Sequence, residues 1–256
     1  MEVTDFSRAQ GHWILAKMGK RVLRPGGKEL TQKLVSGLDV NHKDDIVEFA
    51  PGLGYTASLT LAKLPHSYVG VDADEDAVRL LKQKIKGNNI QFILGQASET
   101  HLDNDSKDKV YGEAMLTMHA DHRKSEIIRE SHRILKKGGL YAIHELGLVD
   151  VNEEQKEQIQ RDLAICIKVN ARPLTENEWK ELLEKEGFKI KQVYTNAMHL
   201  LESKRIFDDE GFWRAMKITF NILRNKAART RINEMKRVFK KHDKHMNSIA
   251  IIAEKI

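Results

Sequence analysis

The chain has 256 residues, of which 41% are hydrophobic and 31% charged. This length allows a full buried core, as one large α/β domain with insertions or as one domain with a small cap. No apolar run is long enough to cross a bilayer, and we expect no signal peptide, because residues 1–5 lack its basic and apolar regions. The single cysteine, Cys166, excludes an intrachain disulfide framework and a thiolate-rich zinc site. We therefore expect a cytoplasmic protein.

The first 45 residues predict two amphipathic helices, separated by a turn at residues 24–27. Apolar runs then alternate with helical patterns, which predicts five strands, at residues 46–50, 67–71, 90–94, 110–117 and 140–146. The helices between them are expected at residues 55–64, 73–86 and 121–136, and Gly138-Gly139 is expected to end the last one at its C′ position.

The alternation loosens after residue 147. Residues 152–169 predict a mostly polar helix, and Thr175 and Glu178 have the capping-box spacing that begins another helix, at residues 175–186. The remaining elements are expected to be a strand at 188–194, one or two basic helices within 207–242 and a short strand at 248–253. We predict an α/β fold with a doubly wound, mainly parallel, seven-stranded sheet whose last strand is antiparallel. Ligands of such open sheets bind beyond the carboxyl ends of the strands.

The net charge of +6 is concentrated in one segment. From Arg224 to Lys244 there are nine Lys or Arg residues against Glu234 and Asp243, a local charge of +7. Apolar residues recur among the basic ones, so the segment predicts an amphipathic helix with a basic outer face. We prefer a solvated face. The alternatives are contact with RNA phosphates and contact with an anionic membrane near a lipophilic substrate. Few aromatic residues interleave with the basic ones, which disfavours stacking on single-stranded RNA.

The loop after the first predicted strand reads Glu48-Phe49-Ala50-Pro51-Gly52-Leu53-Gly54. A glycine-rich turn between a strand and a helix lets the backbone approach a ligand and points the helix N-terminus at it. A dinucleotide-binding pattern requires a small residue where Tyr55 stands, so that class of site is disfavoured. The Gly-Lys-Ser/Thr of a P-loop is absent from the sequence.

This loop resembles the acidic–x–small–x–Gly–x–Gly loop of the class I (Rossmann-like) S-adenosylmethionine-dependent methyltransferases, with Glu48, Ala50, Gly52 and Gly54 in the motif positions. The resemblance extends over residues 46–146 in three further segments. These are Val69-Gly70-Val71-Asp72, similar to the family's second strand; Gly95-Gln96-Ala97, similar to its Gly-Asp-Ala; and residues 134–140, similar to its Leu-Lys-Pro-Gly-Gly turn. Asp72 lies 18 residues beyond Gly54, about the spacing of a ribose-binding acid.

The resemblance implies S-adenosylmethionine as the cofactor. The residues it implies as cofactor-binding are Glu48, Ala50, Pro51, Gly52, Gly54, Asp72, Ala73, Gln96 and Ala97. In the family the acid at the position of Asp72 binds the ribose hydroxyls, and a carboxylate accepts both of them. Gln96 replaces the usual Asp but still matches the adenine edge. Ala50 replaces the usual Gly, which is tolerable if its φ is negative.

The implied organisation is a helical N-terminal lid at 1–45, a cofactor-binding Rossmann-like core at 46–150, and a remainder at 151–256. That remainder completes the sheet and carries helical cap insertions at about 152–172 and 203–242. We expect a substrate pocket formed by Trp13, Met18, Lys20, Arg24, Met118 and Trp213.

A sulfonium methyl group is already electrophilic, so the enzyme mainly has to align the nucleophile and exclude water. Family resemblance favours His119, after the fourth strand, as a base, followed by Glu145; His144 is a third candidate and fits a structural role better. We expect no metal site, because His119 and His122 lack a third ligand. We expect a small-molecule methyl acceptor. An RNA methyltransferase using the 224–244 helix and a non-catalytic cofactor-binding protein are the alternatives, and the first lacks an Asn/Asp-Pro-Pro-Tyr motif.

Overall fold

A computed structural model describes residues 6, 9–198 and 203–256 of the chain. One sheet runs through the molecule in the strand order β3-β2-β1-β4-β5-β8-β7, and a short strand, β6, pairs with β5. The strands are β1 Asp45–Phe49, β2 Ser67–Asp72, β3 Ile90–Leu94, β4 Lys107–Glu113, β5 Leu135–Leu148, β6 Leu174–Thr175, β7 Phe188–Ala197 and β8 Met246–Lys255.

All pairs from β3 through β5 are parallel, and only β8 runs antiparallel to its neighbours β5 and β7. The prediction of a mainly parallel sheet with an antiparallel last strand is therefore confirmed. β6 adds a two-residue strand that the sequence pattern does not show. Strand order reverses between β1 and β4, which is where ligands of open α/β sheets bind.

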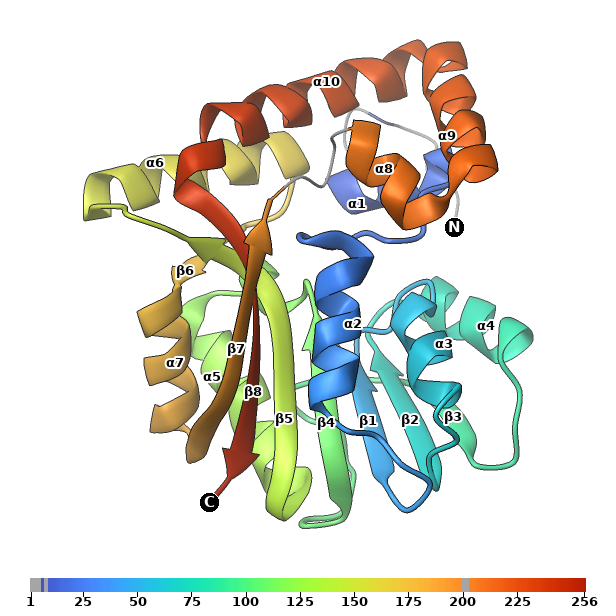
Figure 1. The fold of residues 1–256 in the computed structure, drawn as a ribbon, viewed down its shortest axis with the longest axis vertical. Helices are drawn as coiled ribbons and strands as arrows, with labels where there is room; N and C mark the ends of the chain where they lie inside the picture. Colours follow the sequence, from blue (N-terminus) through green and yellow to red (C-terminus); the bar gives the residue numbers. More distant parts are fainter. Residues whose placement is uncertain (1–5, 7–8, 199–202) are drawn as a thin grey trace.

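Helices cover both faces of the sheet (Figure 1). One apolar core joins the sheet to α2 Gly27–Gly37, α3 Tyr55–Leu61 and α4 Glu75–Lys84. The other joins it to α5 Asp121–Ile134 and α7 Glu176–Lys185. α2 was expected in the N-terminal lid, but Leu30, Leu34 and Val35 pack into the first core, so this helix belongs to the layer on the sheet.

A separate group of helices lies above the carboxyl ends of the parallel strands (Figure 1). It consists of α1 Gly11–Met18, α6 Glu153–Ile167, α8 Ser203–Glu210, α9 Phe212–Arg224 and α10 Lys226–Lys241, and we call it the cap. The last three replace the one or two helices that the sequence predicts. Residues 1–5, 7 and 8 of the expected lid lie outside the described residues.

Hydrogen bonds join α8 of the cap to residues 21–28, the segment that leads from α1 into α2. The Glu210 carboxylate accepts from the amides of Arg21 and Val22 at 2.6 and 2.9 Å. Asp209 accepts from the Lys28 amide at 2.9 Å. α1, α9 and α10 also share one apolar core, which is distinct from the two cores on the sheet.

The end of α5 differs from the sequence pattern. α5 ends at Ile134, and Gly138, with φ +77°, lies within β5 at a break in its register with β4 rather than at C′ of the helix. The Thr175–Glu178 capping box of α7 is confirmed. A second box, Asn152–Gln155, begins α6, and Gln in place of Glu makes this signal less visible in sequence.

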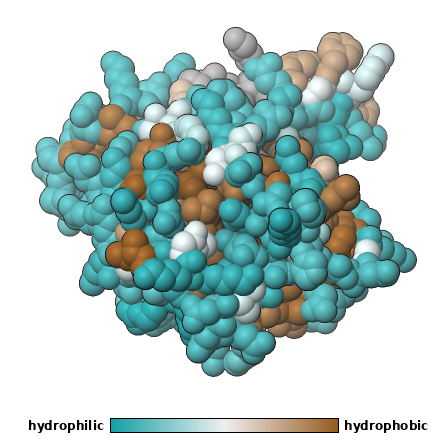
Figure 2. Space-filling model, turned by 60° about the horizontal axis from the view of Figure 1, so that its bottom comes forward, coloured by the Kyte–Doolittle hydropathy of each residue, from teal (hydrophilic) through white to brown (hydrophobic). Residues whose placement is uncertain are grey.

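Hydrophilic side chains cover most of the face seen in Figure 2, and hydrophobic ones appear there in small separate groups. In the described part of the chain no helix is both long enough and apolar enough to span a membrane.

Candidate active site

A cavity of about 530 Å³ opens at the carboxyl ends of β1, β2 and β4, under the cap. Its volume lies within the roughly 300–1,000 Å³ of ligand pockets. Seven of the nine residues expected to bind the cofactor line it: Ala50, Pro51, Gly52, Asp72, Ala73, Gln96 and Ala97. Residues from the loops after β1, β2 and β3 thus line one cavity.

Asp72 ends β2 and faces this cavity. Its carboxylate accepts hydrogen bonds from the amides of Gly52 and Asp74, both at 3.0 Å. Burial raises the pKa of Asp72, although these amides oppose the shift. Gly52 has φ +54°, and a Cβ there would meet no atom closer than 3.9 Å, so the backbone side of the loop is open to a ligand. A carboxylate beside an open glycine fits a ribose and its attached chain.

Ala50 departs from the expectation of a negative φ. Its φ is +52°, a left-handed conformation that costs a residue with a Cβ roughly 1–2 kcal/mol. Its amide donates to the Val71 carbonyl at 2.8 Å, which ties the start of the loop to β2. The methyl group of Ala50 also packs against the apolar core of the sheet. The loop therefore keeps the shape of the glycine-containing motif under local strain.

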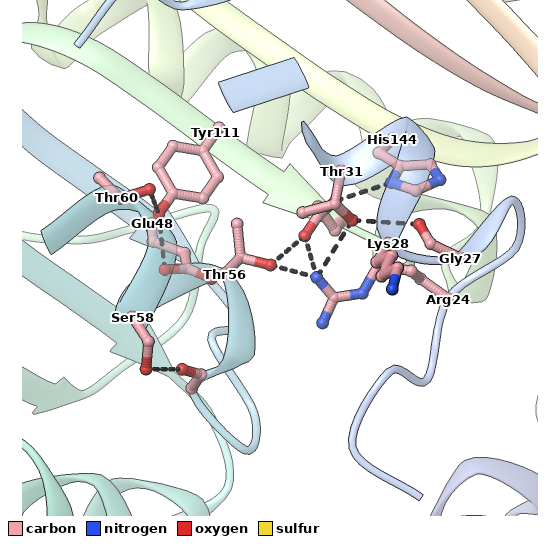
Figure 3. Close-up of polar contacts among 12 residues, drawn as sticks. Arg24, Gly27, Lys28, Thr31, Glu48, Thr56, Ser58, Thr60, Tyr111 and His144 are labelled. Carbon is pink, nitrogen blue, oxygen red and sulfur yellow. Dashed lines mark hydrogen bonds and ion pairs between the residues drawn. The ribbon is translucent and has the colours of Figure 1, made fainter. Parts of the chain in front are cut away.

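Glu48 and Gly54 were expected to bind the cofactor, but neither lines the cavity. Glu48 points into the sheet layer, where it accepts from the hydroxyls of Tyr68 and Tyr111. Figure 3 shows its contact with Tyr111. Burial raises the pKa of Glu48 to about 7, although both hydroxyls oppose the shift. Gly54 is the N-cap of α3, with φ +76°, and a Cβ there would lie 2.5 Å from Leu81. Both residues therefore support the loop on the side away from the cavity.

Arg24 reaches the cavity from the N-terminal segment and forms a buried network at the end of β4 (Figure 3). Its guanidinium contacts Glu113 and Thr56, and the Thr31 hydroxyl donates to Glu113 at 2.7 Å. Burial by itself would raise the pKa of Glu113, but Arg24 and the His144 hydrogen bond together lower it to about 2. Arg24 thus lines the main cavity, and its charge is paired with that of Glu113.

His144 is not available for catalysis. Its side chain is fully buried, with Nδ1 2.7 Å from Glu113 and Nε2 2.6 Å from the Pro25 carbonyl. Both ring nitrogens are therefore occupied, and the residue joins β5 to the N-terminal segment.

Glu145 has a structural role, and its side chain also lines the smaller cavity described below. It accepts from the amides of Met115, Leu116 and Thr117 at 2.8–3.0 Å and from the Thr117 hydroxyl at 2.7 Å. Burial raises its pKa, although these donors oppose the shift. The carboxylate holds the loop after β4 in a fixed shape.

His119 follows this loop and lines the main cavity together with Met118 and Trp13, as expected. Burial lowers the pKa of His119, and the nearby Arg123 adds to the effect. The imidazole is therefore neutral at pH 7 and able to accept a proton.

The other three expected pocket residues lie elsewhere. Met18 is buried in the apolar core of the cap, and Lys20 is buried in an ion pair with Asp209 at 3.4 Å. Trp213 is 84% exposed on the outside of α9. The register of α1 and α9 turns Met18 toward the cap core and Trp213 toward solvent, and Lys20 lies beyond the end of α1.

A second, smaller cavity of about 90 Å³ lies behind the first. It is enclosed by α1, α6 and α10 and by the ends of β4 and β5, and most of its lining is apolar. His12, Leu23, Ala114 and Met118 line both cavities. The sequence gives no direct signal for this cavity or for Glu113, because both depend on how the cap sits on the sheet.

Comparisons with known proteins agree with this geometry. A family model described as a methyltransferase domain matches residues 46–139. An uncharacterized protein of Haemophilus influenzae is 32% identical over 250 residues, covering 96% of this chain and 98% of that protein. A phosphoethanolamine N-methyltransferase of Plasmodium falciparum is 20% identical over 218 residues, covering 78% of this chain and 82% of that protein. The structure of Haemonchus contortus phosphoethanolamine N-methyltransferase 2 with S-adenosyl-L-methionine has a TM-score of 0.71 at 16% identity, covering 96% of this chain and 56% of that one.

The sheet is mainly parallel, with a glycine-bearing loop at the end of one strand and an acid at the end of the next. This arrangement is typical of proteins that bind a nucleoside cofactor. Together with the methyltransferase-domain match over residues 46–139, this places the chain among the class I S-adenosylmethionine-dependent methyltransferases.

Proposed function

We propose that this protein transfers the methyl group of S-adenosylmethionine to a nucleophile on a small, mainly apolar molecule. The junction of the two cavities carries this proposal, because four residues line both. A molecule whose reacting end occupies the smaller cavity faces directly into the space lined by Asp72 and the loop at Gly52. This arrangement supports alignment of a nucleophile with a bound methyl donor.

The lining of the smaller cavity supports an apolar acceptor. Its apolar side chains come from three cap helices and include Leu15, Leu163, Ile167, Met235 and Phe239. None of the described residues in this lining is Lys or Arg, the side chains that usually hold a phosphate. The substrate in the names of the P. falciparum and H. contortus proteins carries a phosphate. We therefore propose a different acceptor class here. The volume of about 90 Å³ holds about three waters, so it accommodates only the reacting end of the acceptor.

The roles of the residues follow from their positions. S-adenosylmethionine, when bound, supplies an electrophilic methyl group and keeps the bonding electron pair on sulfur. Asp72 would hold the ribose, and the amides near Gly52 would face the attached chain. Burial lowers the pKa of His12 to about 4, although Asp74 opposes the shift, so its ring is neutral at pH 7. His12 would orient the nucleophile at the junction. His119 would accept the proton of a nucleophile that arrives protonated.

Two experiments test the two halves of this proposal. Calorimetry with S-adenosylmethionine measures the cofactor site alone. A labelled-methyl assay then compares apolar phenols, amines and thiols with phosphoethanolamine as acceptors. We expect cofactor binding and transfer to members of the apolar panel. Transfer to phosphoethanolamine alone would refute the acceptor class, and cofactor binding without transfer to any acceptor would favour a non-catalytic role.

A matched pair of variants locates the acceptor. Ala171 is buried and lines the smaller cavity, whereas Ala227 is exposed on α10. Ala171→Leu adds three carbon atoms inside the cavity, so we expect at least a tenfold increase in the KM of the acceptor with unchanged cofactor affinity. Ala227→Leu is the control and should change neither. An unchanged acceptor KM in Ala171→Leu would place the acceptor elsewhere.

A further inference from the structure

The outer side of α9 exposes large apolar side chains to solvent. Trp213 is 84% exposed, and Leu223 and Phe212 are 60% and 59% exposed. Monomeric proteins rarely expose contiguous apolar patches of this kind without an interaction partner. We call this surface the α9 patch; it consists of Phe207, Phe212, Trp213, Met216, Phe220 and Leu223.

The exposure follows from the way α9 is anchored. Its inner side buries Ala215 and Ile218 in the core shared with α1 and α10. The Asn221 side chain donates to the Met18 carbonyl at 2.9 Å and fixes the rotation of the helix. Residues three and four positions apart share a helix face, so the opposite side necessarily presents Phe212, Met216 and Phe220. Rotating the helix would bury the patch only by exposing its present core.

Positive charge surrounds the patch. From Gly211 to Asn233 the sequence contains six Lys or Arg residues and no Asp or Glu. Lys217 and Arg224 are exposed on α9 itself, and the Arg224 guanidinium lies 5.4 Å from the centre of the Phe220 ring. α10 continues the basic sequence, from Lys226 at its start to Lys241 at its end. An exposed acid, Asp208, lies on α8 beside Phe207.

We propose that the α9 patch docks on the surface of an anionic lipid bilayer. An amphipathic helix with aromatic side chains on one face and Lys or Arg beside them lies in the plane of the lipid headgroups and favours anionic lipids. Tryptophan is enriched at that depth because its ring is apolar with a polar N–H. α9 lies at the outer end of the cap, away from the strand ends (Figure 1).

The location of the patch connects it to the cavities. α9 packs on α1, and His12 of α1 borders both cavities. A bilayer at α9 would therefore lie against the same helical cap that encloses the smaller cavity. Docking on lipid does not depend on the proposed acceptor, and it is tested without methyl transfer.

Vesicle sedimentation tests the proposal with the full chain. The probes are vesicles of phosphatidylcholine alone and of phosphatidylcholine with phosphatidylglycerol. We expect binding to the anionic vesicles, at least tenfold weaker binding to the neutral ones and loss of binding at high salt. The double variant Trp213→Ser/Phe220→Ser should bind anionic vesicles at least tenfold more weakly. Leu64→Ser is the control, because Leu64 is 75% exposed on the loop after α3.

Tryptophan fluorescence gives a second, local measurement. Trp179 is fully buried and Trp213 is 84% exposed, so insertion of Trp213 into headgroups should shift the emission to shorter wavelength. Trp213→Phe should remove most of this shift while vesicle binding persists. Unchanged melting temperature and cofactor affinity show that the variants are folded.

Three results would overturn the proposal. These are absence of binding to anionic vesicles, equal binding by the double variant, and a concentration-dependent dimer that Trp213→Ser dissociates without any lipid binding. The last result would assign the patch to a second copy of the chain. Salt-dependent binding to RNA without lipid binding would likewise assign the basic face to nucleic acid.

Discussion

The buried Glu48 carboxyl provides a quantitative test of its structural role. Gln is isosteric with a protonated Glu and has no charge, and its carbonyl still accepts from Tyr68 and Tyr111. Burial raises the pKa of Glu48 from 4.5 to about 7 in the folded protein. At 1.36 kcal/mol per pKa unit, the difference corresponds to about 3 kcal/mol.

The sign follows from proton binding. Below about pH 4.5 the carboxyl is protonated in both states, so it contributes nothing to the pH dependence. Between about 4.5 and 7 the folded protein keeps a proton that the unfolded chain has released, so stability falls as pH rises. Above about pH 7 the Glu48 carboxyl is ionised in both the folded and the unfolded state, and the loss of stability is complete. We therefore expect Glu48→Gln to become more stable than the wild type as pH rises, by up to about 3 kcal/mol above pH 7.

Urea unfolding of both proteins at pH 5, 6, 7 and 8 measures this difference. Groups remote from Glu48 titrate alike in the two proteins and cancel in the comparison, and Glu113, which interacts with Glu48, has a pKa of about 2 and is ionised throughout this pH range. A difference in the free energy of unfolding that is independent of pH, or that favours the wild type at high pH, would refute the reasoning. Cofactor affinity should be unchanged, because Glu48 does not line the cavity.

Three other substitutions give separate outcomes. Asp72→Ala should weaken S-adenosylmethionine binding by roughly 10²-fold or more, since hydrogen bonds to a charged group are worth about 1.5–3 kcal/mol each; calorimetry measures this, with Asp103→Ala on an exposed loop as control. Ala50→Gly should raise the free energy of unfolding by roughly 0.5–1 kcal/mol, because relief of the left-handed strain exceeds the added chain entropy, and thermal melting tests this. His119→Ala should reduce turnover by about 10²-fold with cofactor affinity retained; full activity would remove His119 from the chemistry.

The sheet and the cofactor loop were predictable because their signals are local. Alternating apolar runs indicate the strands, and the spacing between Gly54 and Asp72 relates two adjacent strand ends. Parallel pairing then brings those ends together without further information. The capping box at Thr175 is similarly complete within four residues.

The side chains around the site were less predictable because their direction depends on packing. Glu48 and Glu145 both stand near strand ends, where functional acids are common. The register of β1 instead pairs Glu48 with Tyr111, and the bend after β4 directs three amides at Glu145. Trp213 was expected in the substrate pocket, and only the anchoring of α9 on α1 shows that its side of the helix faces outward.

The bonds from Asp209 and Glu210 to residues 21–28 have a consequence for protein engineering. They join α8 to the N-terminal segment, in which Arg21 lies 189 positions before Glu210 in sequence. Exchange of the cap with that of a relative, as a way to change acceptor choice, would therefore have to include the N-terminal segment together with the C-terminal helices. A chimera that takes only the C-terminal helices keeps the hydrogen bonds from the amides of Arg21 and Val22 only if the incoming helices carry a carboxylate at the position of Glu210.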